Sequence, residues 1–523
     1  AITYKYDNYG NRIEERYYGI NNEPIYINMC ASIQYDYYPN GLIMEDRYYD
    51  ENGKLCLNNK WYAISRYEWD NNGNQTKVSF FDTDTVPCYY KDGLYSCMEF
   101  IYDNNGNEIK EIFYDSKGNV SLMSKGLYAI AEFKFDNYRH IIEYSYFNEK
   151  GQPCYYDKDY HILRVKYDLR GNVTQRSIYG VDGKPTLSRE GSSIIEYKYD
   201  SKNNIIRTDF KDITGNNINQ RNRGYSTEVV TYDNMSNIIR REYYDMHGKP
   251  CMINAHYSDY NMFFSSSTCK YDNWGNCIEF AYYDVFGKAT KAMTYAFKYV
   301  QYDICGRVIE EKYKQSDGKL AQGGNHHMAI LRYKYNKNSN YVSEVLFYDT
   351  DSILQAHLYQ TVEKGHITRK EIRDKDNKLK SMYISGFTDI KCAIMTDSLN
   401  VYGLNIKRSY YDENGKLGNT EEGIAILRNS YDQFGRITLQ TVFDKNDKPV
   451  CGITMKFHKR SISYNEKGLV KETAYFDENN HYVNTPLLQG YCKEILNYDD
   501  CGDLDRNASK WYYSVDGKAI DEK

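Results

Sequence analysis

Several short acidic segments of this sequence resemble the start of a calcium-binding loop. Asp70-Asn71-Asn72-Gly73-Asn74 and Asp103-Asn104-Asn105-Gly106-Asn107 place oxygen-bearing side chains at the first, third and fifth positions. An EF-type loop also needs a bidentate Glu at position 12, and position 12 from Asp103 is Tyr114. Asp and Asn before Gly are equally the residues that hairpin turns prefer. We therefore interpret these segments as turns, and we expect no metal site and no cofactor.

Thirteen cysteines are a second set of residues with possible metal or redox chemistry. No Cys-x-x-Cys pair occurs, so a thiolate metal site is not expected. Five cysteines lie two or three residues after a Gly-Lys turn or its equivalent, which favours a buried ladder of free thiols: Cys56, Cys88, Cys154, Cys251 and Cys451. Cys269 and Cys277 flank one turn, and a disulfide between them stays an open alternative.

The ten histidines are scattered, and only His326-His327 form a pair. They follow Gly323-Gly324-Asn325 in a variable segment, which favours a solvated loop over a ligand pair. The sequence has no Gly-x-Ser-x-Gly, His-Glu-x-x-His or P-loop motif. We therefore expect no catalytic residues and a protein that is not an enzyme.

All of these residues belong to a repeat that runs through the chain. Its motif is Tyr-Asp-x-x-Gly-Asn, an apolar residue, an aromatic pair and a second turn of the form Asp-x-x-Gly-Lys. Most steps between units are 31 to 34 residues, and Asn400 follows Asn336 by 64, which leaves room for one degenerate unit around Gly365 and Asn377-Lys378. The first-turn anchors of the about sixteen units are Asp7, Asp36, Asp70, Asp103, Asp136, Asp168, Asp200, Asp233, Asp272, Asp303, Asn336, Asn400, Asp432, Asn465 and Asp499.

Each unit is predicted to be a β-hairpin followed by a return segment. Alternation such as Ile195-x-Tyr197-x-Tyr199 is typical of strands, and Asp-x-x-Gly supplies turn chemistry. Adjacent aromatics, as in Phe113-Tyr114, must point to opposite faces of the sheet, so one row can fill a core. We predict an all-β protein of tandem β-hairpin repeats of about 33 residues, forming a curled ribbon, superhelix or solenoid-like shell.

Two irregular stretches divide the single array. It is predicted to be regular over 1–250, to carry an insertion at 251–268, to be regular over 269–349, degenerate over 350–399 and regular again over 400–523. The insertion is aromatic and is either a bulged turn or a ligand-contacting loop; the candidate contact residues are Tyr257, Tyr260, Phe263 and Phe264. The degenerate unit is locally basic and is a candidate hinge or interface.

Composition limits the classes of partner. The 523 residues include 59 Tyr and carry 67 Lys+Arg against 72 Asp+Glu, a net charge of −5 without basic blocks, so a nucleic-acid partner is not expected. No apolar run approaches about 18 residues, so we expect no membrane span. The chain opens within the motif and without Met, which leads us to expect a segment of a longer array or units that self-associate end to end.

The motif resembles the YD signature of RHS-type repeat proteins. The resemblance rests on Tyr302-Asp303-Ile304-Cys305-Gly306-Arg307-Val308 and Tyr431-Asp432-Gln433-Phe434-Gly435-Arg436-Ile437. Most other units have Asn in place of the Arg, and the second Asp-x-x-Gly-Lys turn is unlike the commonest YD spacing. The resemblance implies a spiralling hairpin ribbon, often a hollow shell, with roles in encapsulation, adhesion or carbohydrate binding, in bacterial toxins, wall-associated proteins and teneurins.

The predicted function is therefore structural: a surface scaffold, shell or adhesive ribbon whose partner is a protein or glycan surface. Two alternatives stay open. One is a carbohydrate or cell-wall binding module that uses exposed aromatic rows, and the other is a carrier shell for a toxin or enzyme outside this segment. The resemblance favours the cell surface or secretion, whereas cysteines without evident pairing are also compatible with the cytoplasm.

Overall fold

The computed structural model describes most of the chain. It covers residues 1–19, 22–91, 93–124, 127–257, 260–292, 294–323, 326–336, 339–363, 365–388, 390–465, 468–488, 490–497, 510–516 and 519–521. For 254–257, 260–262, 510 and 519–521 it describes the backbone alone. The described secondary structure is β-strand throughout, apart from one 3-10 turn, η1 (Pro486–Leu488). No described helix is long or apolar enough to cross a bilayer.

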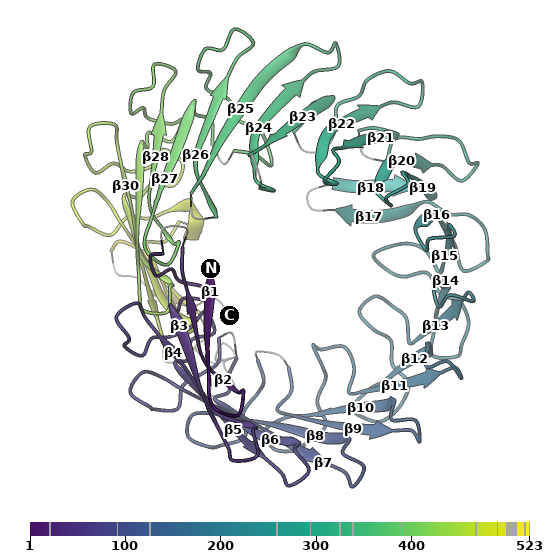
Figure 1. Cartoon of the computed structure of the whole chain (residues 1–523). Helices are drawn as coiled ribbons and strands as arrows, with labels where there is room; N and C mark the ends of the chain where they lie inside the picture. The colour runs from purple at the N-terminus through teal and green to yellow at the C-terminus, as the bar shows by residue number, and fades with distance from the viewer. Residues whose placement is uncertain are drawn as a thin grey trace. The chain divides into compact units, whose positions relative to one another are not determined.

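The strands follow the predicted repeat (Figure 1). The first half of the chain forms β1 (Ile2–Tyr6), β2 (Arg12–Tyr17), β3 (Ser32–Tyr37), β4 (Ile43–Tyr49), β5 (Ile64–Trp69), β6 (Gln75–Phe81), β7 (Cys97–Tyr102), β8 (Glu108–Tyr114), β9 (Ile130–Phe135), β10 (Ile141–Phe147), β11 (Ile162–Tyr167), β12 (Val173–Tyr179), β13 (Ile194–Tyr199), β14 (Ile205–Lys211), β15 (Thr227–Tyr232), β16 (Ile238–Tyr244), β17 (Ile253–Tyr257) and β18 (Tyr260–Phe264).

The second half continues the series. It forms β19 (Ser266–Tyr271), β20 (Cys277–Tyr283), β21 (Phe297–Tyr302), β22 (Val308–Lys314), β23 (Ile330–Tyr335), β24 (Val342–Tyr348), β25 (Leu354–Glu363), β26 (His366–Arg373), β27 (Ile394–Leu399), β28 (Asn405–Tyr411), β29 (Ile426–Tyr431), β30 (Ile437–Phe443), β31 (Lys459–Tyr464), β32 (Val470–Phe476), β33 (Lys493–Leu496), β34 (Lys510–Tyr513) and β35 (Ala519–Asp521).

Thirty-three of the described strands form one antiparallel sheet, and β17 and β18 form a separate two-stranded sheet. The predicted all-β fold of tandem hairpins is confirmed. Within a hairpin the strands pair along their length, as β7 and β8 do from Cys97↔Tyr114 to Tyr102↔Glu108. Successive hairpins pair over fewer residues, as β8 and β9 do from Lys110↔Glu132 to Ile112↔Ile130. The residues between a second turn and the next hairpin do not join this pairing. They form what we call the return segment.

The chain divides into two compact units. Unit 1 comprises residues 1–162, 398–408 and 422–523, and unit 2 comprises 163–397 and 409–421.

The first turns are built as predicted from their aspartates. In the Asp103 turn, the carboxylate Oδ1 accepts hydrogen bonds from the backbone N–H groups of Asn105 and Asn107 at 2.8 and 2.9 Å, and Oδ2 accepts one from Asn107 Nδ2 at 2.9 Å. Gly106 has φ +75°, a conformation that glycine adopts without strain. The carboxylate oxygens thus serve the turn itself, which is the interpretation favoured over calcium.

One predicted anchor within the described residues is wrong, and the anchor predicted at Asp499 lies outside them. In the second hairpin, the residue that closes the first turn is Tyr38, whose N–H donates to the carbonyl of Leu42, and not Asp36, which forms an ion pair with Arg47 from within strand β3. The Tyr-Pro-Asn-Gly turn lacks the anchoring carboxylate, so the preceding Tyr-Asp pair looked like the motif. With Tyr38 as anchor, the steps from Asp7 and to Asp70 become 31 and 32 residues, in line with the rest.

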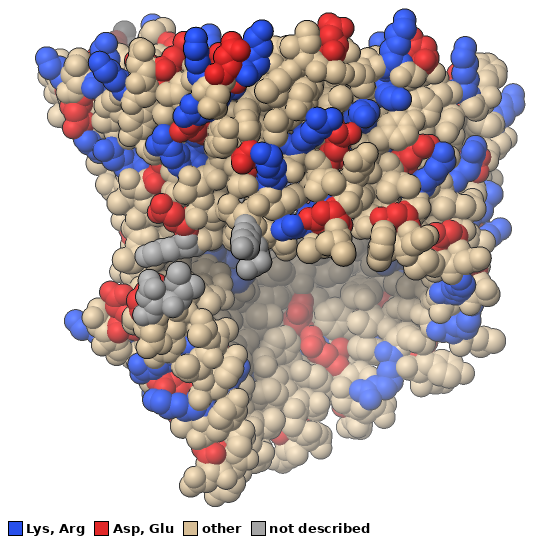
Figure 2. All heavy atoms as spheres, turned by 45° about the horizontal axis from the view of Figure 1, so that its top comes forward, with Lys and Arg blue, Asp and Glu red and all other residues tan. Residues whose placement is uncertain are grey.

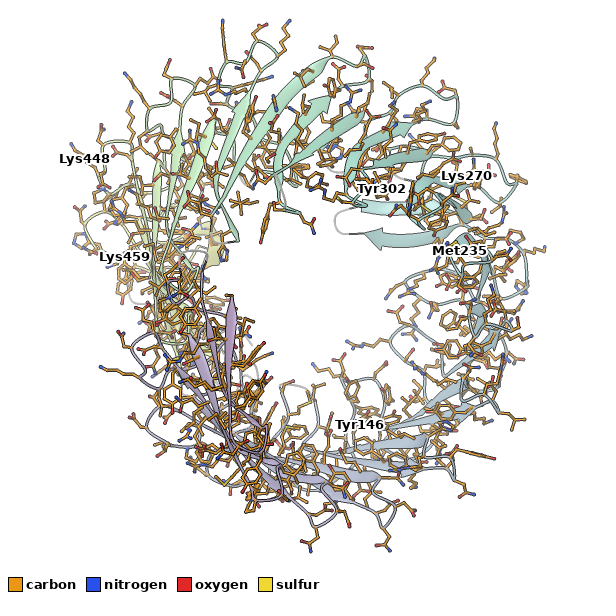
Figure 3. All side chains as sticks on the ribbon, viewed as in Figure 1. Tyr146, Met235, Lys270, Tyr302, Lys448 and Lys459 are labelled. Carbon is orange, nitrogen blue, oxygen red and sulfur yellow. A yellow bond between two sulfur atoms is a disulfide. The ribbon has the colours of Figure 1, made fainter. Side chains whose placement is uncertain are left out.

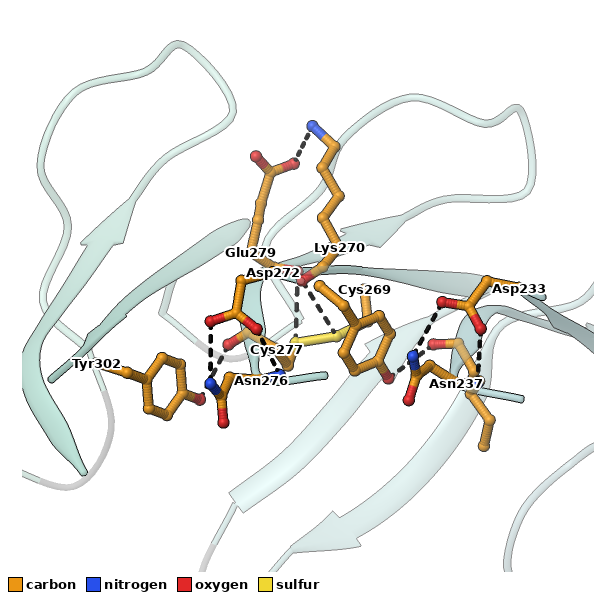
Figure 4. Close-up of a disulfide and its surroundings, with 11 residues drawn as sticks. Asp233, Asn237, Cys269, Lys270, Asp272, Asn276, Cys277, Glu279 and Tyr302 are labelled. Carbon is orange, nitrogen blue, oxygen red and sulfur yellow. Dashed lines mark hydrogen bonds and ion pairs between the residues drawn. A yellow bond between two sulfur atoms is a disulfide. The ribbon is translucent and has the colours of Figure 1, made fainter. Parts of the chain in front are cut away.

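A β-bulge beside the first turn redirects the motif tyrosine. The second strand has one extra residue there, so the register shifts at this tyrosine, as between Gln301 and Tyr302 in the β21–β22 hairpin. The Tyr302 hydroxyl then donates to the carbonyl oxygen of Cys277 in the preceding hairpin at 3.0 Å (Figure 4). The motif tyrosine therefore joins hairpin to hairpin.

This bond recurs in ten described hairpins, at donor–acceptor distances of 2.7 to 3.0 Å, with the indole N–H of Trp69 as one donor. The pairs are Tyr37–Arg12, Trp69–Ile43, Tyr102–Gln75, Tyr199–Val173, Tyr232–Ile205, Tyr271–Ile238, Tyr302–Cys277, Tyr335–Val308, Tyr431–Asn405 and Tyr464–Ile437. Each acceptor is the carbonyl at the start of the preceding hairpin's second strand.

The first aromatic of each pair fills the core, where it alternates with an aromatic from the return segment. Neighbouring ring centroids lie 4.7 to 6.2 Å apart, in the range for favourable ring contacts. In unit 1 this aromatic ladder is Tyr48, Tyr62, Phe80, Tyr95, Phe113, Tyr128 and Tyr146 (Figure 3 labels Tyr146). In unit 2 it is Phe210, Tyr225, Tyr243, Phe264, Tyr282, Tyr295 and Tyr313.

The degenerate stretch is also a hairpin, formed by β25 and β26. Its turn contains Gly365 at φ +83°, and Ile372, at 2 % exposure, takes the core position of the missing aromatic. No return segment precedes it, because the turn at 349–353 leads directly into the pairing of Tyr348 with Leu354.

Candidate functional site

The second aromatic of each pair lies on the other face of the sheet and is half-buried. A cationic side chain from the first strand covers many of these rings: Arg66 lies over Phe81 at 4.4 Å and Arg428 over Phe443 at 4.3 Å, measured to the ring centroid. The same arrangement recurs at Arg164–Tyr179, Arg332–Tyr348, Lys459–Phe476 and Lys493–Tyr513. At these six positions the cation lies over a face of the ring, which leaves little open aromatic surface there.

The insertion contributes an extra hairpin of β17 and β18, in which Tyr257 pairs with Tyr260 at the tip. The side chains of both tyrosines lie outside the described residues. Phe263 is 48 % exposed and stays a candidate contact residue. Phe264, at 6 % exposure, is a rung of the aromatic ladder, 5.9 Å from Tyr243 and 4.9 Å from Tyr282. It is therefore a core residue that cannot reach a ligand without unpacking.

All five cysteines are half-buried, and four of them, Cys56, Cys88, Cys154 and Cys251, occupy the same position of the repeat. Cys56 Sγ donates to the carbonyl of Met29 at 3.7 Å and Cys88 Sγ to that of Trp61 at 3.6 Å, and Ser121 makes the equivalent bond to Leu94 at 2.6 Å. The position holds a small donor in these units and an apolar residue in others, such as Ile218, Ala321 and Val450. Burial raises the pKa of the thiols of Cys56, Cys88 and Cys451 to about 12, and of Cys154 and Cys251 to about 11, which keeps them protonated and unreactive.

The open alternative for Cys269 and Cys277 is resolved in favour of a disulfide (Figure 4). The two residues lie on β19 and β20, on either side of the Asp272 turn, with their Cα atoms 6.2 Å apart. Among the described residues, no group of three or more His, Cys, Asp or Glu side chains could hold a metal ion.

His326 is a packing residue, which corrects the solvated-loop interpretation. Its ring lies 5.7 Å from that of Tyr313 and 6.5 Å from that of Phe387, and its Nδ1 accepts a hydrogen bond from the backbone of Met328 at 3.1 Å. Burial lowers the pKa of His326 to about 4, so the ring is neutral. His327 is exposed, as predicted for the loop. The sequence pattern gave no sign that the return segment turns His326 inward.

One acid, Glu108, has a strongly raised pKa, and two others, Glu111 and Glu311, accept hydrogen bonds from the core. Burial, together with nearby Glu111, raises the pKa of Glu108 to about 7. Glu111 accepts a hydrogen bond from the Tyr128 hydroxyl at 2.6 Å, and Tyr313 donates to Glu311 in the same way at 2.8 Å. These carboxyls satisfy tyrosine hydroxyls of the aromatic ladder, as buried polar groups require.

Two edges of the array meet within unit 1, in what we call the seam. First turns near the C-terminus dock on return segments near the N-terminus: the ring of Tyr402 lies 4.8 Å from that of Tyr26, and Phe434 lies 5.5 Å from Trp61. One repeat further along, Leu469 packs on the cluster of Leu94 and Leu122. Successive first turns on one side of the seam therefore contact successive return segments on the other side.

The Trp61 contact is the most extensive of the seam. The guanidinium of Arg436 lies 4.9 Å above the indole, and a Cβ placed on Gly468 would come within 2.2 Å of it. Trp61 itself is 9 % exposed. The first turn of one hairpin and the return segment of another thus form complementary apolar surfaces, which makes these edges the candidate interaction surfaces of the molecule.

Charge does not single out a different site. On the face drawn in Figure 2, Lys and Arg alternate with Asp and Glu, without a large area of one sign. Many are paired across strands, as Lys77 is with Glu99 at 3.0 Å and Lys110 with Glu132 at 2.8 Å. A groove of about 750 Å³ lies between the Asp103 and Asp136 turns, at the same edge that forms the seam elsewhere.

Comparisons with known proteins give only distant likenesses. No family model matches the sequence, and no curated protein is a detectable relative. The crystal structure of TcdB2-TccC3-TEV matches 98% of this chain and 28% of its own, at 11% identity and TM-score 0.31. TcdB2-TccC3 without its hypervariable C-terminal region matches 100% of this chain and 30% of its own, at 13% identity and TM-score 0.26.

A third likeness is to the Photorhabdus luminescens Tc holotoxin pore, with 98% of this chain and 27% of that chain covered, at 10% identity and TM-score 0.23. The chain thus spans less than a third of the length of the structures it matches.

Proposed function

We propose that the chain is a non-catalytic scaffold of the RHS/YD-repeat type, which acts as a structural or interaction protein through the edges of its hairpins. The observation that carries the proposal is the motif tyrosine bond, which joins each of ten hairpins to its predecessor. The residues that define the repeat therefore hold the array together, as expected when the array itself is the functional object.

The RHS/YD assignment is supported by how Asn and Arg perform the same task. Arg307 Nε and Arg436 Nε each donate to the motif Asp at 2.7 Å, where Asn276 Nδ2 donates at 2.9 Å to Asp272. His140 takes the same position beside Asp136. Where this sequence has Asn in place of the Arg of the YD signature, the Asn side chain thus donates the same hydrogen bond to the motif Asp.

Carbohydrate binding by the outward aromatic row is the less supported alternative. Glycans stack on open ring faces, whereas here Arg or Lys side chains cover the faces of six such rings. Only the β17–β18 hairpin retains a partly exposed aromatic of the predicted set, Phe263.

Hydrogen–deuterium exchange of the full chain tests the proposal. For a scaffold we expect protection that recurs with the repeat, high in the strands and low at both turns, and unchanged by chitohexaose or laminarihexaose. Saturable new protection at 253–264 with either sugar, lost in Phe263→Ala, would instead establish a glycan-binding module.

A further inference from the structure

The first turns of unit 2 carry a row of exposed apolar side chains at their tips. Met235, Trp274 and Ile304 lie on three consecutive hairpins and are 67 %, 83 % and 100 % exposed (Figure 3 labels Met235). Turn chemistry does not require them, since the tip positions of the Asp70 and Asp103 turns are all Asn. With two strands to a hairpin, neighbouring tips lie about 10 Å apart, so the three form one interrupted apolar strip.

Two of these tips correspond to the residues that dock in the seam of unit 1, whereas Ile304 stands one residue after its motif Asp. Trp274 and Met235 stand two residues after their motif Asp, as Phe434 does after Asp432 and Tyr402 after Asn400. In the seam, those two side chains lie against Trp61 and Tyr26. The same position of the repeat is thus a docking residue in one part of the molecule and an exposed one in another.

The opposite edge is also exposed in places. Return segments leave Leu187 and Met252 of unit 2 at 37 % and 39 % exposure, and Ile453 and Leu487 of unit 1 at 60 % and 58 %. The seam shows that return segments of this sequence accept first-turn tips. Every copy of the chain therefore carries both partners of the contact, and a net charge of −5 over 523 residues opposes association only weakly.

We propose that the tip row of Met235, Trp274 and Ile304 docks on the return-segment edge of a second copy of this chain, in the manner of the seam. Because the two surfaces differ, the contact is head-to-tail, and such contacts continue into open assemblies unless the rotation closes a ring. The inference deepens the scaffold proposal and rests on it: the scaffold would present its edge to another copy of itself.

The test compares two tips of one hairpin. Trp274 and Phe286 each stand two residues after a turn Asp, at 83 % and 90 % exposure, and their N–H groups donate to that Asp at 2.9 Å. Trp274 belongs to the first turn and Phe286 to the second. In sedimentation velocity over a wide concentration range, we expect wild type to associate, Trp274→Ser to weaken association by about tenfold or more, and Phe286→Ser to match wild type.

The native thiol of Cys305 gives a second readout, because it is exposed and stands beside Ile304 in the same turn. We expect a bulky maleimide to label Cys305 quickly in dilute protein and slowly in concentrated wild type, but at the same rate at both concentrations in Trp274→Ser. A wild type that stays monomeric, or equal association of the two variants, overturns the assembly. The exchange pattern expected of the scaffold is measured on dilute protein, so the two proposals can fail separately.

Discussion

The motif aspartate shows how one side chain determines a turn. In the Asp272 turn, Oδ1 accepts the N–H groups of Trp274 and Asn276 at 2.9 Å, and Oδ2 accepts Asn276 Nδ2. All of these bonds favour the ionised carboxylate. They hold the pKa of Asp272 below its usual value of 3.8, with the Asn276 side chain as the largest cause, and the pKa of Asp70, Asp168 and Asp233 is lowered in the same way.

Acid should therefore destabilise the array. A carboxyl whose pKa is lower in the folded state contributes stability above its unfolded pKa, and that stability is lost as the pH falls through the folded value. We expect the thermal midpoint to fall progressively as the pH drops from about 4 to about 2. Circular dichroism melts in this range provide the measurement, and a midpoint independent of pH would contradict the role given to the turn aspartates.

Exchanging the donor at the end of the first turn tests the equivalence of Asn and Arg. Asn276→Ala removes the side-chain bond to Asp272, and we expect a loss of about 0.5–1.5 kcal/mol in local opening free energy, measured by hydrogen exchange of β19 and β20. Asn276→Arg should recover most of that loss, because Arg307 makes the same bond to Asp303. An Arg variant as weak as the Ala variant would disprove the equivalence.

At the scale of the element, two devices join each hairpin to the next: the motif tyrosine bond and the aromatic ladder. The bulge turns a tyrosine that would otherwise follow the strand alternation toward the preceding hairpin. The ladder places a return-segment ring between each two second-strand rings. Hairpins that share only a short backbone pairing are thereby held by side chains.

Removing one hydroxyl should loosen one junction. Tyr302→Phe deletes the bond to the Cys277 carbonyl and leaves the ring, so we expect a loss of about 1 kcal/mol, seen as faster exchange in β20 and β21. Tyr9→Phe is the control, because Tyr9 is 92 % exposed at a turn tip. Equal effects of the two variants would show that the hydroxyl bond does not join the hairpins.

Adjacent phenylalanines of the insertion separate packing from exposure. Phe264→Ala should cost about 3–5 kcal/mol and expose β16, β19 and β20 to exchange, since it removes a buried rung of the ladder. Phe263→Ala should change stability by no more than about 0.5 kcal/mol. A destabilisation of similar size in both variants would contradict the ladder.

The sequence predicts the elements well because turns and strands are local. Asp-x-x-Gly and the period of two locate the strands. Among the anchors that the structure describes, only Asp36 is misplaced, because the Tyr38 turn closes without a carboxylate. The alternation shows that Phe113 and Tyr114 point to opposite faces of the sheet. It treats the two faces alike, so it does not predict which of them packs against the return segments. His326 packs against Tyr313 because of the backbone path of its return segment. No repeating sequence pattern predicts that path.

At the scale of the whole molecule, unit 1 is built from stretches far apart in sequence: 1–162, 398–408 and 422–523. The seam joins them, and no local pattern could predict it, because 376 residues separate Tyr26 from Tyr402. Period alone also gives no hint that the tips Tyr402 and Phe434 are docked while Trp274 is exposed. Long-range contacts of this kind are what the three-dimensional arrangement adds.

The seam can be tested with two glycines of the same backbone conformation. Gly468 has φ +78° and Gly10 has φ +88°, so alanine is strained at both. A Cβ on Gly10 meets nothing within 4 Å, whereas one on Gly468 would lie 2.2 Å from Cζ3 of Trp61. The difference between Gly468→Ala and Gly10→Ala therefore isolates the clash with the indole ring.

We expect Gly468→Ala to speed hydrogen exchange both in its own hairpin, β31–β32, and in β5–β6 next to Trp61. Gly10→Ala should affect only β1–β2. Trp61→Ala, which removes the ring that Phe434, Arg436 and Gly468 contact, should relieve the clash of the Gly468→Ala variant in the double mutant while loosening the seam by itself. If Gly468→Ala leaves β5–β6 unchanged, or if the two substitutions are additive, the seam does not couple the two ends of the repeat series.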